Sequence, residues 1–311
     1  MERGPERVLK VVFLGTSSFA LPALKVLHDS NSVGLVVSRP DRPSGRGRKI
    51  NRPPVAVLAD QLGIPLLQPE KLRQIRDAVS EFSPDVMVSA SYGGWLPEWF
   101  LSMAPLGVVN IHPSLLPAHR GAAPVIRTVL QGDTETGVCF MVTDKGWDTG
   151  DILQTIRYSL DGTETAGELE VKLADLAAKA LPGVLKDYAS GEIRPVPQSG
   201  MESYAEKVTS EEAVISWSLS SEEIVRAVLA FNPVPGARTM FHSKVLKIYR
   251  AEVSSFSGPP GVILETSPLV AGCGKGSVRL TEVQPQGKRV MSAEDYVRGY
   301  RIQRGAVLGE G

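Results

Sequence analysis

The chain has 311 residues, 42% of them hydrophobic and 22% charged, with 34 basic and 34 acidic side chains. This size and balance allow a large buried core and favour two domains over one. No apolar run approaches the roughly 18 residues that a membrane helix needs, and charge at the amino terminus leads directly into a strand-like segment, unlike a signal peptide. We therefore expect a soluble cytoplasmic protein that does not bind membranes.

The metal-binding residue types are sparse. Cys139 and Cys273 lie far apart, and the four histidines are scattered singly. Neither a disulfide framework nor a zinc site is supported by this spacing, so we expect no metal.

The amino-terminal half alternates between apolar strand-like runs and helical segments. The run Val8–Leu14 predicts a buried parallel strand, followed by a glycine turn at Gly15 and a helix near Phe19–His28. This is how nucleotide-binding folds open, but the G-x-G-x-x-G fingerprint is absent, so we expect no nucleotide cofactor. Further elements are predicted as strands at Val33–Val37, Ile64–Leu67 and Asp85–Ala90 and as helices at Pro54–Leu62, stopped by Gly63, and Leu72–Phe82.

A basic segment follows the second predicted strand. Between Arg39 and Arg52 there are six basic residues and one acid, Asp41, among prolines and glycines that exclude a continuous helix or strand. Most charged loops are merely solvated. Six cations in fourteen residues would repel one another, however, so we expect an exposed loop that contacts a phosphate backbone.

The stretch from Gly107 to Pro124 has the strongest features of an active site. An apolar strand, Gly107–Ile111, ends beside Asn110 and His112, whose spacing of two residues directs both side chains to one face. In an open α/β sheet, ligands bind at the carboxyl ends of the strands. Pro113, Pro117 and Pro124 stiffen the following loop. The alternative is an ordinary hydrogen-bonded polar pair.

A second polar cluster supports the functional interpretation. The apolar strand Val138–Val142 leads into a loop in which Asp148 lies between Trp147 and a Thr149-Gly150 turn. We expect Asn110, His112 and Asp148 all to leave carboxyl ends of strands, where an amide, an imidazole and a carboxylate form a plausible proton-handling trio.

Strand and helix alternation from residue 8 to 190 predicts a doubly wound, largely parallel Rossmann-like sheet. Its last helix opens with the capping box Thr165-x-x-Glu168 and ends at Gly191. Residues 192–206 form an exposed linker. Beyond them, short strands near 213–217, 238–242, 244–253, 261–265 and 277–283 and a helix at Ser221–Ala230 predict a small open β-barrel of the OB-like type, which binds oligonucleotides or serves a structural role. The domains are thus 1–191 and 207–311.

Several segments together resemble the bacterial methionyl-tRNA formyltransferases over nearly the whole chain. They are FLGTSSFA, SRPDRPSGRGRKI, ASYGGWLP, NIHPSLLPAHRGAAP, TGVCFMVTDKGWDTGDIL, YAEKVTSEEAVISW and RAVLAFNPVPG. The Asn-His-Asp set and the Ser-Leu-Leu-Pro run are shared by the wider formyltetrahydrofolate-using superfamily and imply formyl transfer. The basic loop and the second domain point to methionyl-tRNA. Departures occur at Ala118-His119, at Lys145-Gly146-Trp147 and at Val234.

The resemblance implies an activity and a set of site residues. The α-amine of methionine on an initiator tRNA would attack the formyl carbon of 10-formyltetrahydrofolate, with Asn110 and His112 donating to the oxyanion and Asp148 orienting His112. The folate donor would contact Tyr92 and Gly93 and the turn of Ser114, Leu115, Leu116 and Pro117. The acceptor tRNA would contact Arg42, Arg46, Arg48, Lys49 and Lys207.

Two classes of alternative are open. One is a formyltransferase for a small amine, or a formyltetrahydrofolate hydrolase; the basic loop and the barrel argue against both. The other is an inactive tRNA-binding protein, which the intact Asn110, His112 and Asp148 argue against. A monomer is the default expectation.

Overall fold

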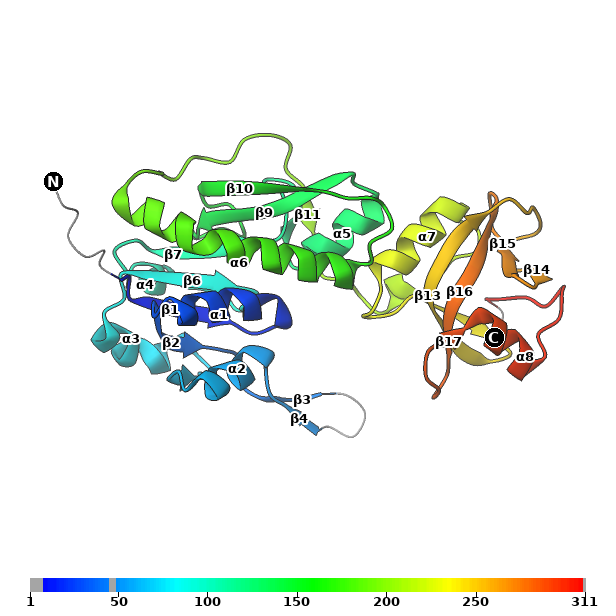
Figure 1. Ribbon diagram of the computed structural model, residues 1–311, viewed down its shortest axis with the longest axis horizontal. Helices are drawn as coiled ribbons and strands as arrows, with labels where there is room; N and C mark the ends of the chain where they lie inside the picture. The colour runs from blue at the N-terminus through cyan, green and yellow to red at the C-terminus, as the bar shows by residue number, and fades with distance from the viewer. Residues whose placement is uncertain (1–7, 45–48, 310–311) are drawn as a thin grey trace. The chain divides into compact units, whose positions relative to one another are not determined.

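The computed structural model describes residues 8–44 and 49–309. Arg46 and Arg48, two of the residues expected to bind tRNA, lie outside this range. The chain forms two compact units (Figure 1). The first comprises Met1–Pro124, Glu135–Ser159 and Glu170–Ala205, and the second comprises Val125–Thr134, Leu160–Leu169 and Glu206–Gly311.

A seven-stranded sheet in the order β10-β9-β7-β6-β1-β2-β5 forms the centre of the first unit. Five neighbouring strands, from β7 to β5, are parallel, as the alternation of strands and helices predicts. The other two strands, β9 and β10, are antiparallel to their neighbours. The strands are β1 (Val11–Gly15), β2 (Val33–Val37), β5 (Leu66–Leu67), β6 (Val86–Ala90), β7 (Val108–His112), β9 (Glu135–Val142) and β10 (Ile152–Ser159).

Both faces of the parallel part are covered, so that β1 and β6 are buried at every position. One face packs against α3 (Arg76–Phe82) and α4 (Glu98–Leu101) in a core cluster that includes Leu14 and Phe100. On the other face, α1 (Leu21–Asp29) and α6 (Ala166–Ser190) lie in front of the strands in Figure 1. Burial on both faces explains why these strands read as continuous apolar runs rather than alternating ones.

Local sequence signals account for several helix ends. The helix α2 (Pro54–Leu62) has the predicted bounds and ends at Gly63, which adopts φ +67. Thr165 and Glu168 exchange the hydrogen bonds of a capping box at the start of α6, and Gly191 follows its last residue with φ +78. Short 3-10 helices lie at Ser18–Ala20 (η1), Leu72–Ile75 (η2) and Glu211–Ala213 (η3).

Residues 192–206, expected to be an exposed linker, largely belong to the first unit. Val196 bridges to Ile152 at the edge of the large sheet. Further on, β11 (Tyr204–Ala205) pairs in parallel with β8 (Arg120–Gly121). We call residues 196–205 the strap. Its hydrogen bonds hold it against the segment that follows β7.

The second unit contains an antiparallel sheet in the order β12-β13-β16-β15-β14, with β17 also paired to β16, which forms an open half-barrel. Its core includes Trp217, Phe241 and Ile248. The strands are β12 (Arg238–Phe241), β13 (Lys244–Ser254), β14 (Ile263–Thr266), β15 (Leu269–Gly272), β16 (Ser277–Pro285) and β17 (Met291–Ser292), and the helices are α7 (Ser221–Ala230) and α8 (Ala293–Tyr300).

One prediction in this unit is wrong, and two of its elements were not predicted. Residues 213–217 form no strand; Val214 makes a single bridge to Arg238. The sequence reading missed β15, whose four residues are all buried, and also α8. The remaining described elements are the hairpin strands β3 (Arg42–Ser44) and β4 (Lys49–Asn51) and the helix α5 (Pro124–Gln131). Among the described residues, no helix combines the length and apolar character needed to span a bilayer.

Candidate active site

Strand β7 carries the first two site residues at its carboxyl end. Asn110 pairs in register with Ser89 of β6 and Met141 of β9, and His112 lies opposite Cys139 of β9. Because the two residues are separated by one, their side chains leave the same face of the sheet. Both residues lie on a strand near its carboxyl end, as the sequence predicts.

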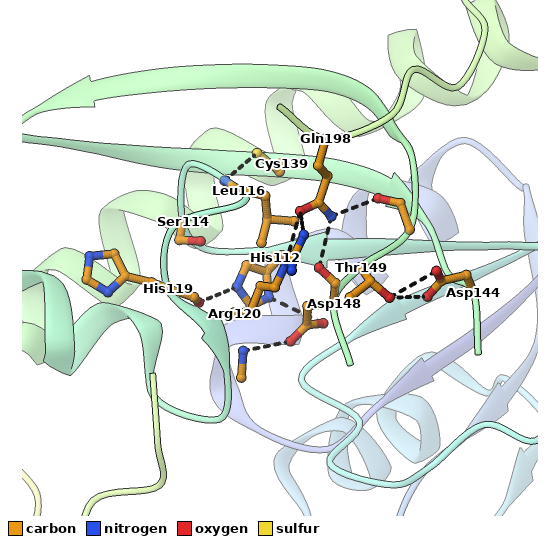
Figure 2. A network of polar contacts seen from close by, with 12 residues as sticks. His112, Ser114, Leu116, His119, Arg120, Cys139, Asp144, Asp148, Thr149 and Gln198 are labelled. Atoms are coloured by element: carbon orange, nitrogen blue, oxygen red, sulfur yellow. Dashed lines mark hydrogen bonds and ion pairs between the residues drawn. The ribbon is translucent and has the colours of Figure 1, made fainter. Parts of the chain in front are cut away.

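The imidazole of His112 is buried and faces acceptors on both sides (Figure 2). Its Nε2 lies 2.9 Å from the backbone oxygen of His119. Because a carbonyl oxygen only accepts, Nε2 carries a proton in this arrangement. Its Nδ1 lies 3.7 Å from Oδ1 of Asp148, which is ion-pair distance but too long for a good hydrogen bond. The Nδ1 edge is thus the part of the ring directed toward the carboxylate.

Asp148 comes from the loop of residues 143–151 between β9 and β10. Its Oδ2 accepts a hydrogen bond of 2.9 Å from the backbone N–H of Gly121, and its φ of +53 is in the left-handed region. Asp148 follows the carboxyl end of β9, as predicted, but because β9 runs antiparallel to β7, this end lies at the opposite edge of the sheet from His112. The contact arises instead because the loop places this carboxylate beside the residues that follow β7.

Close packing and side-chain hydrogen bonds fix this loop. Asp144 accepts hydrogen bonds from the hydroxyl of Thr149 and from the N–H of Gly146. A Cβ on Gly150 would lie 1.9 Å from the backbone oxygen of Val142, so only glycine fits there. The indole of Trp147 contacts that of Trp95, with ring centroids 5.1 Å apart. Both indoles are exposed, and the pair joins the loop to the segment after β6.

The amide of Asn110 is available to a ligand. It is half-buried, and within the described part of the chain its side chain makes no hydrogen bond. An amide at a strand end that is not used by the protein can donate to a substrate oxygen.

Sequence reasoning missed a network that adjoins this site. Gln198 of the strap donates from Nε2 to the backbone oxygens of Asp148 and Gly150, at 2.9 and 2.8 Å. Its Oε1 accepts from Nε and Nη2 of Arg120, at 3.1 and 2.8 Å, and Nη1 of Arg120 pairs with Glu202 at 2.6 Å. In the sequence, the network is marked only by Arg120, a basic residue that follows the Pro-rich loop. Its position does not show that Gln198 is its partner.

Comparison with known proteins identifies the family. The Formyl transferase model matches residues 9–185, and the model for the Formyl transferase C-terminal domain matches residues 207–301. The methionyl-tRNA formyltransferase of Myxococcus xanthus is 41% identical, covering 96% of this chain and 97% of that protein. That of Neisseria gonorrhoeae is 43% identical, covering 96% and 100%. The chain belongs to the methionyl-tRNA formyltransferase family. HypX from Aquifex aeolicus, in complex with tetrahydrofolic acid, has a similar fold, with a TM-score of 0.66 and 15% identity over 94% of this chain and 47% of that one.

The turn after β7, Ser114–Pro117, is the segment that the family resemblance connects with folate. Here Ser114 is buried, and its hydroxyl donates to the backbone oxygen of Ala118 at 2.7 Å. The N–H of Leu116 lies 3.4 Å from Sγ of Cys139, and burial raises the pKa of this thiol. Leu115 is only half-buried. The serine hydroxyl and the cysteine thiol therefore shape this turn.

Tyr92 and Gly93 follow β6 as predicted, but the side chain of Tyr92 is buried. Burial raises the pKa of its phenol, and a hydrogen bond and the charge of Arg39 partly oppose this effect. The hydroxyl of Thr16, after β1, donates to the backbone oxygen of Tyr92 at 2.8 Å. Gly93 has φ +70 and open space where a Cβ would lie. The backbone here, rather than the tyrosine ring, is what a ligand would approach.

The basic segment is partly neutralised within this formyltransferase, which weakens the repulsion argument made from sequence. Arg42 forms an exposed ion pair with Glu70. Arg52 pairs with Asp41 at 3.2 Å and with Asp60 at 2.6 Å. An exposed pair such as that of Arg42 contributes little to stability, whereas Arg52 joins Asp41 to Asp60 of α2.

Two other residues predicted to contact tRNA lie in different units. Lys49 lies on β4 of the first unit, and Lys207 is exposed in the second unit.

Within residues 8–44 and 49–309, no group of three His, Cys, Asp or Glu residues could hold a metal ion. The two cysteines are buried and free.

Proposed function

We propose that this protein transfers the formyl group of 10-formyltetrahydrofolate to the α-amine of methionyl initiator tRNA, giving N-formylmethionyl-tRNA for translation initiation. The proposal rests on one observation above all: His112 and Asp148 meet at 3.7 Å, and Asn110 lies two residues before His112 on the same strand. Membership of the methionyl-tRNA formyltransferase family supports the choice of substrates.

In the proposed reaction, the amine nitrogen attacks the formyl carbon. A nitrogen–carbon bond forms and the carbonyl electrons move to oxygen, giving a tetrahedral oxyanion. Collapse of this intermediate re-forms the carbonyl and breaks the carbon–N10 bond, and N10 takes up a proton in place of the one that the amine loses. No covalent bond to the protein is needed.

Asn110 and His112 stabilise the oxyanion. His119 accepts the Nε2–H hydrogen bond of His112, and the Nδ1 edge faces Asp148. His112 therefore acts on the oxyanion as a charged ring through Nδ1–H, and the Asn110 amide is the second donor. Donors aimed at the position where charge develops can each contribute about 100- to 1,000-fold in rate. The carboxylate of Asp148 stabilises a positive charge on the ring and accepts the proton released by the amine.

The folate donor occupies the turn of Leu115, Leu116 and Pro117 and the backbone of Tyr92 and Gly93. The tetrahydrofolic acid complex of HypX, a protein of similar fold, supports this class of ligand. The acceptor tRNA contacts Lys207 and the basic segment. The residues of this segment that bind its phosphates are Arg42, Arg46, Arg48 and Lys49. The enzyme acts as a monomer in the cytoplasm.

One assay tests the proposal against its alternatives. The protein is incubated with 10-formyltetrahydrofolate and either charged initiator tRNA, charged elongator tRNA, a small amine or no acceptor. We expect formyl-methionine on the initiator tRNA alone. Formylation of the small amine, or formate release without an acceptor, would instead favour the corresponding alternative, and no reaction in any arm would leave only tRNA binding.

A further inference from the structure

We infer that Gln198 is a positioning residue, which sets the catalytic geometry by holding the backbone around Asp148. This inference rests on the proposed formyl transfer. Gln198 belongs to the strap and follows Asp148 by 50 residues in the sequence. It does not touch the reacting groups but contacts the two segments that present them (Figure 2).

The backbone at Asp148 needs external support. Its φ of +53 is uncommon for a residue other than glycine and costs about 1 kcal/mol or more. Both Asp148 and Gly150 direct their carbonyl oxygens at the same amide of Gln198. These two bonds hold the turn in the conformation that points the carboxylate at His112.

The orientation of the Gln198 amide is determined by its neighbours. Its oxygen faces two N–H groups of the buried guanidinium of Arg120, and its NH2 group faces two carbonyl oxygens. A rotation by 180° would place oxygen against oxygen and N–H against N–H, so only one orientation satisfies all four contacts. Glu202 in turn neutralises Arg120.

Arg120 connects Gln198 to the segment that follows β7. The backbone oxygen of its neighbour His119 accepts a hydrogen bond from Nε2 of His112, and the backbone N–H of its neighbour Gly121 donates one to the Asp148 carboxylate. Gln198 therefore joins, through one amide, the backbone that orients the imidazole and the backbone that orients the carboxylate. Misplacement of a catalytic group by about 1 Å can cost about 100-fold in rate.

Two substitutions separate the parts of this role. Gln198→Glu keeps the length and an acceptor for Arg120 but loses both donors, and Gln198→Met loses the hydrogen bonds without adding charge. We expect kcat to fall about 10- to 100-fold in each variant, with KM for folate and for tRNA changed less than about threefold. Gln284 is the matched control because it is also half-buried, donates to the Lys288 carbonyl and accepts from Tyr249. Gln284→Glu and Gln284→Met should leave kcat unchanged.

A second readout does not depend on turnover. In the NMR spectrum of the whole protein, the ring signals of His112 should shift in Gln198→Met but not in Gln284→Met, while those of His28 and His242 stay in place. If the wild type formylates tRNA and both kcat and the His112 signals are unchanged in folded Gln198 variants, the inference is overturned. A raised KM at unchanged kcat would also overturn it, by making Gln198 a binding residue. If the wild type fails to formylate but the His112 signals shift, the proposed function fails and the positioning role stands.

Discussion

The substitution Asp148→Asn tests whether the charge of this carboxylate drives the reaction. The asparagine keeps the shape and one oxygen for the N–H of Gly121, which Asp148 accepts at 2.9 Å. We therefore expect the protein to remain folded, with Tm changed by only a few degrees. What is lost is the negative charge 3.7 Å from Nδ1 of His112.

The size of the effect follows from this distance. With an effective dielectric constant of about 20, two unit charges at this separation interact by roughly 4 kcal/mol. Solvent screening reduces this value only modestly, because the side chains of His112 and Asp148 are 5% and 17% exposed. Since each 1.36 kcal/mol corresponds to tenfold in rate, kcat should fall by roughly 1,000-fold.

The assay is steady-state formylation of charged initiator tRNA, with kcat and KM determined for both substrates. Asp151→Asn is the control, because Asp151 is exposed in the same loop and its side chain is not part of the network described above. We expect KM to change little in either variant. A kcat for Asp148→Asn within about tenfold of the wild type would refute the electrostatic role of the carboxylate.

Three further tests, one of them with a control substitution, address other parts of the site and the fold. Asn110→Ala should lower kcat by about 100- to 1,000-fold at unchanged Tm, because it removes a donor that the described protein does not use; a raised KM alone would contradict this. Arg42→Ala should raise KM for tRNA and reduce its salt dependence by about one phosphate contact. Arg157→Ala, which also breaks an exposed pair with a glutamate, should leave that dependence unchanged. Burial raises the pKa of Cys273 to about 11, so its contribution to stability is full below the unfolded pKa near 8.5 and is lost as pH rises toward 11. Between pH 8 and pH 10.5, the free energy of unfolding measured in urea should fall by roughly 2 kcal/mol, and by less in Cys273→Ser. An equal fall in that variant would show that the thiol does not cause the pH dependence.

Local patterns predicted most elements because they depend on neighbouring residues. The strand Val33–Val37 and the helix Pro54–Leu62 have the predicted bounds, and Thr165 with Glu168 forms the predicted capping box at the start of α6. The start of α8 could have been predicted from Ser292, a residue type that favours the N-cap position. In the structure its side chain accepts a hydrogen bond from the N–H of Asp295. Residues 213–217, wrongly predicted as a strand, alternate between apolar and polar positions as a strand does. They pair with Arg238 at a single bridge only, and strand pairing does not depend on local sequence.

The sequence by itself determined the central parallel strands and the shared direction of Asn110 and His112, because strand periodicity and burial act over a few residues. Only the tertiary structure decided that β9 runs antiparallel and that Asp148 meets His112 through its loop. It also decided that Gln198, 78 residues from Arg120, closes the network. Such contacts depend on how distant segments pack, and a single amide or carboxylate carries no local signal of the partner that it will find.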